Sequence, residues 1–265
     1  MIVLKIDRHK FIIGELNKYG SILISELSTQ LSVSEETIRR DLKELESSGI
    51  LKRIHGGAFL PEKDDKGAPV EIRETIFSRE KEALSSFVLK NYIKESDTII
   101  LDCSTTCLKL AQLIFNTNMK VTIITNSHRI SHLFTKQSSQ VKLIVIGGEF
   151  RHRSNSFVGY QATDSLLYYF ADKAFISSPA IDLKLGLLDN NFKESRVRKT
   201  MLDQAKQHIL IADHTKFFDS AEFVIADLNN IETIVTDKKL SAEWLDVLNN
   251  KNIKLDYIIK ESSND

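Results

Sequence analysis

Two arginines and a lysine lie close together in a polar segment near the beginning of the chain. Arg39 and Arg40 are neighbours, and Lys43 follows three positions later. Guanidinium groups bind phosphates and can contact guanine edges, so a helix presenting these residues on one face could lie in the major groove of DNA. The candidate DNA contacts are Ser34, Glu36, Thr37, Arg39, Arg40, Lys43, Arg53 and His55.

A second group of polar residues could bind a small anion. The run Asp102-Cys103-Ser104-Thr105-Thr106 follows an apolar stretch and directly precedes a helical pattern. Backbone N–H groups at a helix N-terminus, with hydroxyl groups beside them, are suited to phosphate. The candidate ligand contacts are Asp102, Ser104, Thr105, Thr106, Thr125, Asn126, Gly147, Gly148, Asp182, Glu194 and Lys216.

Each member of the second group also has an ordinary structural explanation. A Ser/Thr cluster before a helix is most often a cap, and a Gly-Gly pair is most often a turn. Four such loops at one edge of a sheet nevertheless favour a binding site. Lys216 supplies a positive charge for a phosphate, whereas Asp102, Asp182 and Glu194 would accept hydrogen bonds from ligand hydroxyls, or from the loop backbone in the case of Asp102.

The first group requires a helix-turn-helix to position it. Ser34 is a good N-cap, and Ile38, Leu42 and Leu45 fall on one helix face that should pack inward. The pattern predicts two preceding helices, at 8–18 and 25–31, then a strand at 50–54 and a wing that returns through residues 55–58. The alternative is a solvated amphipathic helix, which is the usual meaning of a charge run.

The second group requires a sheet whose strands all end at one edge. Short apolar runs predict buried strands at 98–101, 121–124, 141–146, 174–176, 208–212, 223–226 and 233–235. Helical patterns lie between them, at 108–115, 129–134, 162–169 and 194–205, and a long helix is expected over 71–92. This alternation predicts an α/β domain with a mainly parallel sheet, and residues 61–69 are typical of a linker.

Composition excludes several other classes of protein. The chain has 265 residues, enough for two domains, and its 36 basic residues balance 36 acidic ones. Because a nonspecific nucleic-acid binder should be basic overall, positive charge must act locally here. No apolar run approaches a membrane span and no signal peptide begins the chain, so we expect a cytoplasmic protein. Cys103 and Cys107 do not suggest a disulfide framework.

Residues 8–58 resemble the DNA-binding domain of the DeoR family of bacterial transcriptional regulators. The resemblance is carried by Glu26-Leu27, Val33-Ser34, residues 37–42, Leu45-Glu46, Gly49 and residues 55–58. It continues in Ile100-Leu101-Asp102 with Thr105-Thr106, Thr125-Asn126, Gly147-Gly148, Val158-Gly159, residues 172–175, Ile181-Asp182, Gly186 and residues 212–217. One departure is Ser104, where many members have glycine, so that a side chain narrows the pocket or adds a hydroxyl.

The family resemblance implies a winged helix-turn-helix followed by a Rossmann-like α/β domain similar to ribose-5-phosphate isomerase. We therefore expect a DNA-binding domain at 1–60, a linker at 61–75 and a sugar-phosphate effector domain at 76–265. The implied protein is a regulator, more specifically a repressor, of a carbohydrate uptake or catabolism operon. Its partners would be double-stranded operator DNA, a phosphorylated sugar and further copies of the chain, as a dimer or tetramer, with no membrane partner and no cofactor.

An isomerase-like enzyme is the main alternative. Such an enzyme needs carboxylates that move protons between adjacent carbons, and the expected acidic run is replaced by Ser177-Ser178-Pro179-Ala180. We therefore predict no enzymatic activity and no catalytic residue. His128 and His132 could bind a metal on one helix face, but surface histidines are the simpler interpretation, so no metal site is predicted.

Overall fold

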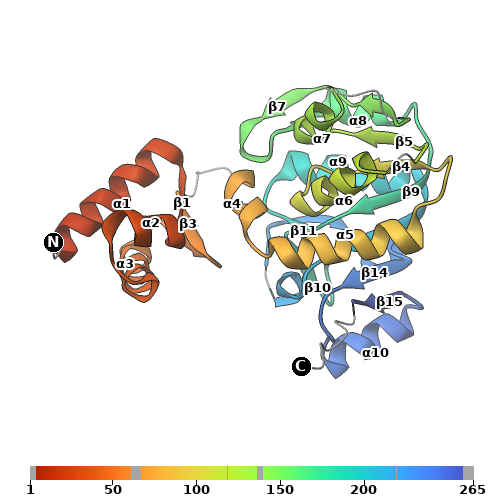
Figure 1. The fold of residues 1–265 in the computed structure, drawn as a ribbon. Helices are drawn as coiled ribbons and strands as arrows, with labels where there is room; N and C mark the ends of the chain where they lie inside the picture. Colours follow the sequence, from red (N-terminus) through yellow and green to blue (C-terminus); the bar gives the residue numbers. More distant parts are fainter. Residues whose placement is uncertain (1–3, 61–66, 118, 136–139, 219, 259–265) are drawn as a thin grey trace, which may run out of the picture. The chain divides into compact units, whose positions relative to one another are not determined.

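The structure is a computed structural model that describes residues 4–60, 67–117, 119–135, 140–218 and 220–258 (Figure 1). The chain divides into two compact units, with the boundary between Ile76 and Phe77.

The N-terminal unit is a three-helix domain with a small antiparallel sheet. Its helices are α1 (Lys5–Tyr19), α2 (Ile24–Leu31) and α3 (Glu35–Ser47), and its strands β1 (Ser21–Leu23), β2 (Lys52–Ile54) and β3 (Gly57–Phe59) pair in the order β1-β3-β2. Strands β2 and β3 form the wing that the sequence predicts at residues 50–58. The winged helix-turn-helix prediction is therefore confirmed.

Local signals in the sequence explain where these helices begin and end. Ser34 caps α3, because its hydroxyl accepts a hydrogen bond from the Thr37 backbone N–H at 3.2 Å. Gly20 ends α1 in the left-handed conformation at φ +74°. Ile38, Leu42 and Leu45 of α3 are buried against the other two helices, as the apolar spacing predicts.

The expected single helix over residues 71–92 is two helices. Helix α4 (Val70–Thr75) belongs to the first unit and α5 (Ser78–Tyr92) to the second. Ile76 is extended and Phe77 is left-handed at φ +52°, so the backbone turns between them. Val70 and Ile72 of α4 are buried, which means that part of the expected linker is packed structure, whereas residues 61–66 lie outside the described residues.

The second unit is built on a seven-stranded parallel sheet. Its strand order is β15-β14-β12-β9-β4-β5-β6, and every neighbouring pair is parallel. The strands are β4 (Thr98–Leu101), β5 (Thr122–Thr125), β6 (Lys142–Val145), β9 (Ala171–Ile176), β12 (Ala205–Ile211), β14 (Thr233–Thr236) and β15 (Lys254–Tyr257). The α/β prediction is confirmed, and the edge strand β15 is an addition to it.

Helices cover both faces of this sheet (Figure 1). One apolar cluster joins α5, α6 (Thr105–Phe115) and α7 (His128–Leu133) to strand residues such as Ile99 and Leu101. The other joins α8 (Tyr160–Leu166), α9 (Phe192–Asp203) and α10 (Ala242–Asn250) to the alternate residue Ile100. Consecutive strand residues point to opposite faces, so a sheet covered on both sides needs continuous apolar strands.

Two small antiparallel sheets lie beside the main one. Strands β7 (Glu149–Arg151) and β8 (Ser156–Val158) pair across the short helix η1 (His152–Ser154). Strands β10 (Ala180–Asp182), β11 (Gly186–Asp189) and β13 (Phe223–Ala226) form the second sheet, so the strand expected at 223–226 is outside the main sheet. The short helices η2 (His214–Phe218) and η3 (Leu228–Asn230) follow β12 and β13.

Candidate functional site

Helix α3 presents its arginines to solvent. The Arg40 side chain is 78% exposed and lies 3.8 Å from Glu36, whereas Arg39 is 49% exposed and lies 2.5 Å from Glu35. Both carboxylates are in the first turn of the helix, where its dipole favours negative charge. Arg40 is therefore the cation of this pair that is more available for an external phosphate or base edge.

The wing residues are positioned by the end of the same helix. Glu46 accepts hydrogen bonds from the backbone N–H of Arg53 at 2.9 Å and from its Nε at 2.6 Å. Burial raises the pKa of Glu46, but these bonds outweigh that effect and lower it, so the carboxylate stays charged. The pair joins α3 to β2, and His55 is exposed at the turn that follows.

Asp41 is a structural residue that the sequence analysis did not single out. It is 2% exposed and accepts hydrogen bonds from Arg8 Nε at 2.7 Å and Arg8 Nη2 at 3.0 Å. His9 Nε2 lies 3.2 Å from the same carboxylate. These contacts join α1 to α3, so Asp41 holds the arginine-bearing helix in place rather than facing outward. Its position three residues after Ile38 was a signal that it lies on the inner face.

In the second unit, the predicted ligand contacts Asp102 and Glu194 are brought together by a residue that was not predicted. Arg198 on α9 donates from Nε to Asp102 at 2.8 Å, and its Nη1 bonds Asp189 and lies 3.5 Å from Glu194. Arg198 and all three carboxylates are buried. Glu194 and Arg198 are four residues apart on one helix, a spacing that brings side chains together, and this spacing could have identified Arg198 from the sequence.

Glu194 is bonded to the protein at both of its oxygens. Its Oε1 accepts from the hydroxyls of Ser154 and Ser156, both at 2.6 Å, and Arg151 Nη1 lies at 3.4 Å. Burial alone would raise the pKa of Glu194, but attraction to Arg198 and Arg151 and the two hydroxyl bonds lower it to about 2. The thiol of Cys103, whose pKa burial raises, donates to the other oxygen at 3.2 Å.

Asp102 is likewise turned toward the protein. It is completely buried, and it accepts from the backbone N–H groups of Ser104 at 3.0 Å and Ser177 at 3.2 Å. Of the two partners expected for Asp102, the structure therefore provides the loop backbone. A contact between either Asp102 or Glu194 and a ligand hydroxyl stays a prediction. The structure shows a buried ionic cluster, which comprises Asp102, Asp189, Glu194 and Arg198.

The hydroxyl-rich loops lie at the carboxyl ends of adjacent strands. Ser104 caps α6 by accepting from the Cys107 N–H at 3.1 Å, and Thr125 accepts from the Ser127 N–H at 3.1 Å. The ordinary capping explanation therefore applies to Ser104. Asn126 donates to the Phe157 carbonyl at 2.9 Å, but its Oδ1 is buried and has no hydrogen-bond partner among the described residues. A buried acceptor of this kind needs a donor.

The other predicted contacts are more scattered. Gly147-Gly148 follows β6, and a Cβ at Gly148 would lie 2.6 Å from the Val158 carbonyl oxygen. Lys216 lies in η2 after β12, with its Nζ 3.9 Å from Asp213. Asp182 instead accepts from the Lys184 and Leu185 N–H groups, both at 2.8 Å, in the turn between β10 and β11. These bonds lower the pKa of Asp182 and give it a turn-forming role.

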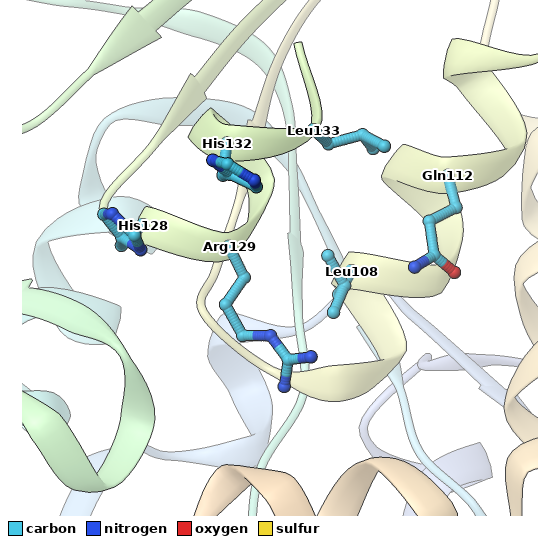
Figure 2. A pocket seen from close by; sticks show the side chains of 6 residues that line it. All are labelled: Leu108, Gln112, His128, Arg129, His132 and Leu133. Atoms are coloured by element: carbon cyan, nitrogen blue, oxygen red, sulfur yellow. The ribbon is translucent and has the colours of Figure 1, made fainter. Parts of the chain in front are cut away.

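A pocket of about 250 Å³ lies between α6 and α7, and its lining residues are Leu108, Gln112, His128, Arg129, His132 and Leu133 (Figure 2). The rings of His128 and His132 are stacked with centroids 6.3 Å apart. Within the described ranges, no group of three or more His, Cys, Asp and Glu side chains could hold a metal ion.

Two family models match the chain over these same regions. The DeoR-like helix-turn-helix domain matches residues 8–64, and the DeoR C terminal sensor domain matches residues 77–238. The chain belongs to the DeoR family. It is a transcriptional regulator whose DNA-binding element is the winged domain, and in this family the α/β unit is the sensor domain.

Similar proteins span nearly the whole chain. The regulator YulB of Bacillus subtilis is 34% identical over 94% of this chain and 95% of its own length. The repressor CsqR of Escherichia coli is 32% identical over 87% of each chain. The glycerol-3-phosphate regulon repressor of Escherichia coli is 28% identical over 94% of this chain and 98% of its own.

Solved structures are more distant. Ribose 5-phosphate isomerase A from Methanocaldococcus jannaschii matches 53% of this chain and 55% of its own, with 15% identity and a TM-score of 0.39. The sorbitol operon regulator SorC from Klebsiella pneumoniae matches 91% of this chain and 99% of its own, with 13% identity and a TM-score of 0.38. Likeness at this level does not bear on function. No helix among the described residues has the length and apolarity needed to cross a membrane.

Proposed function

We propose that this regulator is a repressor of a carbohydrate uptake or catabolism operon, which releases operator DNA when a phosphorylated sugar binds its sensor domain. Residues 1–60 would bind DNA and 76–265 would bind the effector, whereas 61–75 would join these regions, with α4 packed as part of the first unit. One relative is named for a regulon of glycerol 3-phosphate, itself a small phosphorylated polyol. The observation that carries the effector proposal is the buried Asn126 Oδ1 in the loop after β5, for which the part of the chain that the structure describes supplies no donor.

The phosphate would bind at the beginning of α6. The first N–H groups of a helix have no partner within it, and Ser104 satisfies only that of Cys107. The N–H groups of Thr105 and Thr106 would therefore bind phosphate, with Lys216 as the countercharge. A sugar hydroxyl would donate to Asn126 Oδ1. Thr125 and Gly147-Gly148 would shape the pocket, and Asp182 and Glu194 would contact hydroxyls only after local rearrangement.

We further propose that the sensor domain has no isomerase activity. Proton transfer between sugar carbons needs a carboxylate whose pKa suits a general base. Glu194 is a weak base at a pKa of about 2, and Asp102 and Asp189 are both bonded to Arg198. A turnover assay with pentose and hexose phosphates should detect no product above the rate without protein, and measurable turnover would overturn this proposal.

Calorimetry with matched sugars tests the effector site. A panel of sugars, each as the phosphate and the free sugar, would be titrated into the wild type, Lys216→Ala and the control Lys206→Ala. Lys206 lies at the amino end of β12 and pairs with Asp172, whereas Lys216 follows the carboxyl end. We expect only Lys216→Ala to weaken binding of the phosphate. Equal wild-type affinity for a free sugar and its phosphate would overturn the proposal.

We propose further that the regulator is a homo-oligomer, either a dimer or a tetramer. Because it would bind operator DNA, we also propose that it is located in the cytoplasm. Each chain carries a single α3 helix, and dimers of helix-turn-helix proteins contact two half-sites about one helical turn apart. Light scattering of the purified chain should give a mass of two or four times the 30.2 kDa monomer. A monomer at operator-binding concentrations would contradict this part of the proposal.

A further inference from the structure

The first residue of the sensor unit has an unusual backbone conformation. Phe77 lies between α4 and α5 with φ +52° and ψ 34°, in the left-handed region that non-glycine residues rarely adopt. The boundary between the two units is at this point in the chain, and the sensor family match also begins here. Such a conformation persists only where surrounding contacts maintain it.

A ring contact inside the sensor unit holds Phe77. Its ring packs edge-on against the imidazole of His214, with centroids 5.6 Å apart and an interplanar angle of 72°. His214 is fixed in turn by Asp237, which accepts from the His214 backbone N–H at 2.6 Å and lies 2.9 Å from Nδ1. Lys238 Nζ lies 3.0 Å from the other ring nitrogen.

His214 belongs to the same short helix as the proposed phosphate ligand. Helix η2 begins at His214 and contains Lys216, whose Nζ is 3.9 Å from Asp213. Asp213 also accepts from the Thr215 backbone N–H at 3.0 Å. Because His214 and Lys216 are two residues apart in one helical turn, a backbone shift of η2 that brings Lys216 toward a phosphate would also displace His214.

We propose that the Phe77–His214 contact couples effector binding to the junction between the two domains. This inference rests on the proposed function, because it assigns a regulatory route to the same sugar-phosphate site. Phosphate binding at Lys216 shifts η2, changes the support of the Phe77 ring and thereby alters the backbone that leads into the DNA-binding domain. Phe77 is a coupling residue, and it contacts neither ligand nor DNA in this scheme.

The test compares operator affinity with and without a saturating sugar phosphate, using the full chain. Fluorescence anisotropy would be measured for the wild type, Phe77→Ala and Phe77→Leu, and calorimetry would give the effector affinity of each. Phe192→Ala is the matched control, because Phe192 makes a similar edge-on contact with Phe223 at 5.8 Å, away from the chain junction. Phe77→Leu retains most of the apolar bulk if the alanine variant fails to fold.

We expect the wild-type operator affinity to fall by about 5–150-fold with effector, the usual range of allosteric coupling. In the Phe77 variants, the ratio of operator affinity without effector to operator affinity with effector should approach one. The affinity for operator alone and the affinity for effector alone should each stay within about 3-fold of wild type. By reciprocity, operator DNA should weaken effector binding by the same factor in the wild type and not in the variants. A merely structural role for Phe77 would not remove coupling while preserving both affinities.

The experiment distinguishes failure of the proposed effector site from failure of the proposed coupling route. A wild type that binds no phosphorylated sugar refutes the effector site, and the coupling route with it. A wild type that binds and responds, together with Phe77 variants that respond equally, refutes only the coupling route. A loss of response in Phe192→Ala as large as that in the Phe77 variants would also refute it, because the effect would then not be specific to this contact.

Discussion

At the scale of single residues, the sensor domain depends on an arginine that has no ligand role in our proposal. Arg198 is buried among Asp102, Asp189 and Glu194, and it joins the first turn of α9 to the loop after β4. Removing one partner of a buried pair is strongly destabilising, because the remaining charge is left uncompensated. The cluster therefore holds the loop after β4 against α9.

The ionised state of Glu194 should make stability depend on pH. Its folded pKa of about 2 is below the ordinary value of 4.5, so its contribution is complete above about pH 4.5 and disappears as pH falls toward 2. This difference in pKa corresponds to a contribution of about 3 kcal/mol to the free energy of unfolding. We expect the stability advantage of the wild type over Glu194→Gln to shrink across that range, as measured by urea unfolding.

Burial raises the pKa of Asp189, which acts in the opposite direction, and the charge of Glu194 adds to that increase, so Glu194→Gln should also reduce this opposing effect. The control is Glu82→Gln, a change at an exposed carboxylate of α5. An advantage over Glu194→Gln that stays constant from pH 6 to pH 2.5 would contradict the prediction.

The two arginines of α3 should differ in their contribution to operator binding. Arg40→Ala should weaken specific operator binding by about 1–3 kcal/mol if Arg40 contacts a base, and should relax specificity at that position. Arg39→Ala should cost less, because Arg39 is paired closely with Glu35. Gel-shift titrations with operator and scrambled DNA would measure both effects, with Lys18→Ala as an exposed control on α1.

Normal operator affinity in the double variant Arg39→Ala, Arg40→Ala would exclude α3 as the recognition helix, provided that its fold is intact. Circular dichroism of the variant would establish that condition.

At the scale of elements, close approach between neighbours decides how the winged domain packs. A Cβ at Gly57 in β3 would lie 2.3 Å from the Ile22 carbonyl oxygen and 2.6 Å from Ile72 Cδ1. Strand β3 therefore fits between β1 and α4 only because this residue has no side chain. Helix α4 consequently packs as part of the winged domain, although its sequence resembles a continuation of α5.

Two glycine substitutions in this domain should have opposite effects. Gly57→Ala should destabilise the domain by about 1–3 kcal/mol, because the added methyl group overpacks the site. Gly14→Ala should stabilise it by up to about 1 kcal/mol, because Gly14 is inside α1 and a Cβ there meets no atom within 4 Å. Thermal unfolding of the full chain would measure both, and a stabilising effect of Gly57→Ala would contradict the packing described here.

At the scale of the whole molecule, the two units have separate apolar cores. Ile12, Leu16 and Leu42 belong to the core of the N-terminal unit, and two larger clusters lie on the two faces of the sensor sheet. Because each core is formed within its own unit, the units can unfold in separate transitions.

Differential scanning calorimetry should therefore resolve two transitions that respond to different ligands. A sugar phosphate at 100 times its Kd should stabilise the sensor domain by about 2.7 kcal/mol. Operator DNA should raise the unfolding temperature of the N-terminal domain. The free sugar is the control for the first shift and scrambled DNA for the second. A single transition that both ligands raise equally would show that the units unfold together.

The sequence by itself determined many of the helices and strands, because their signals are local. The Ser34 cap and the spacing of Ile38, Leu42 and Leu45 define α3 from neighbouring positions alone. Uninterrupted apolar runs such as residues 98–101 likewise indicate strands buried on both faces. The candidate DNA-binding surface could be proposed for the same reason, since Arg39, Arg40 and Lys43 lie on one short helix.

Only the tertiary structure decided which polar groups neutralise one another. Asp102 and Arg198 are 96 residues apart, and they pair because the fold places the loop after β4 beside α9. The sequence suggested Asp102 and Glu194 as ligand contacts, which stays a prediction, and the fold shows in addition that both are partners of a buried arginine. The break at Phe77 likewise departs from a local helical pattern, and in the fold the Phe77 ring packs against His214, a residue distant in the sequence.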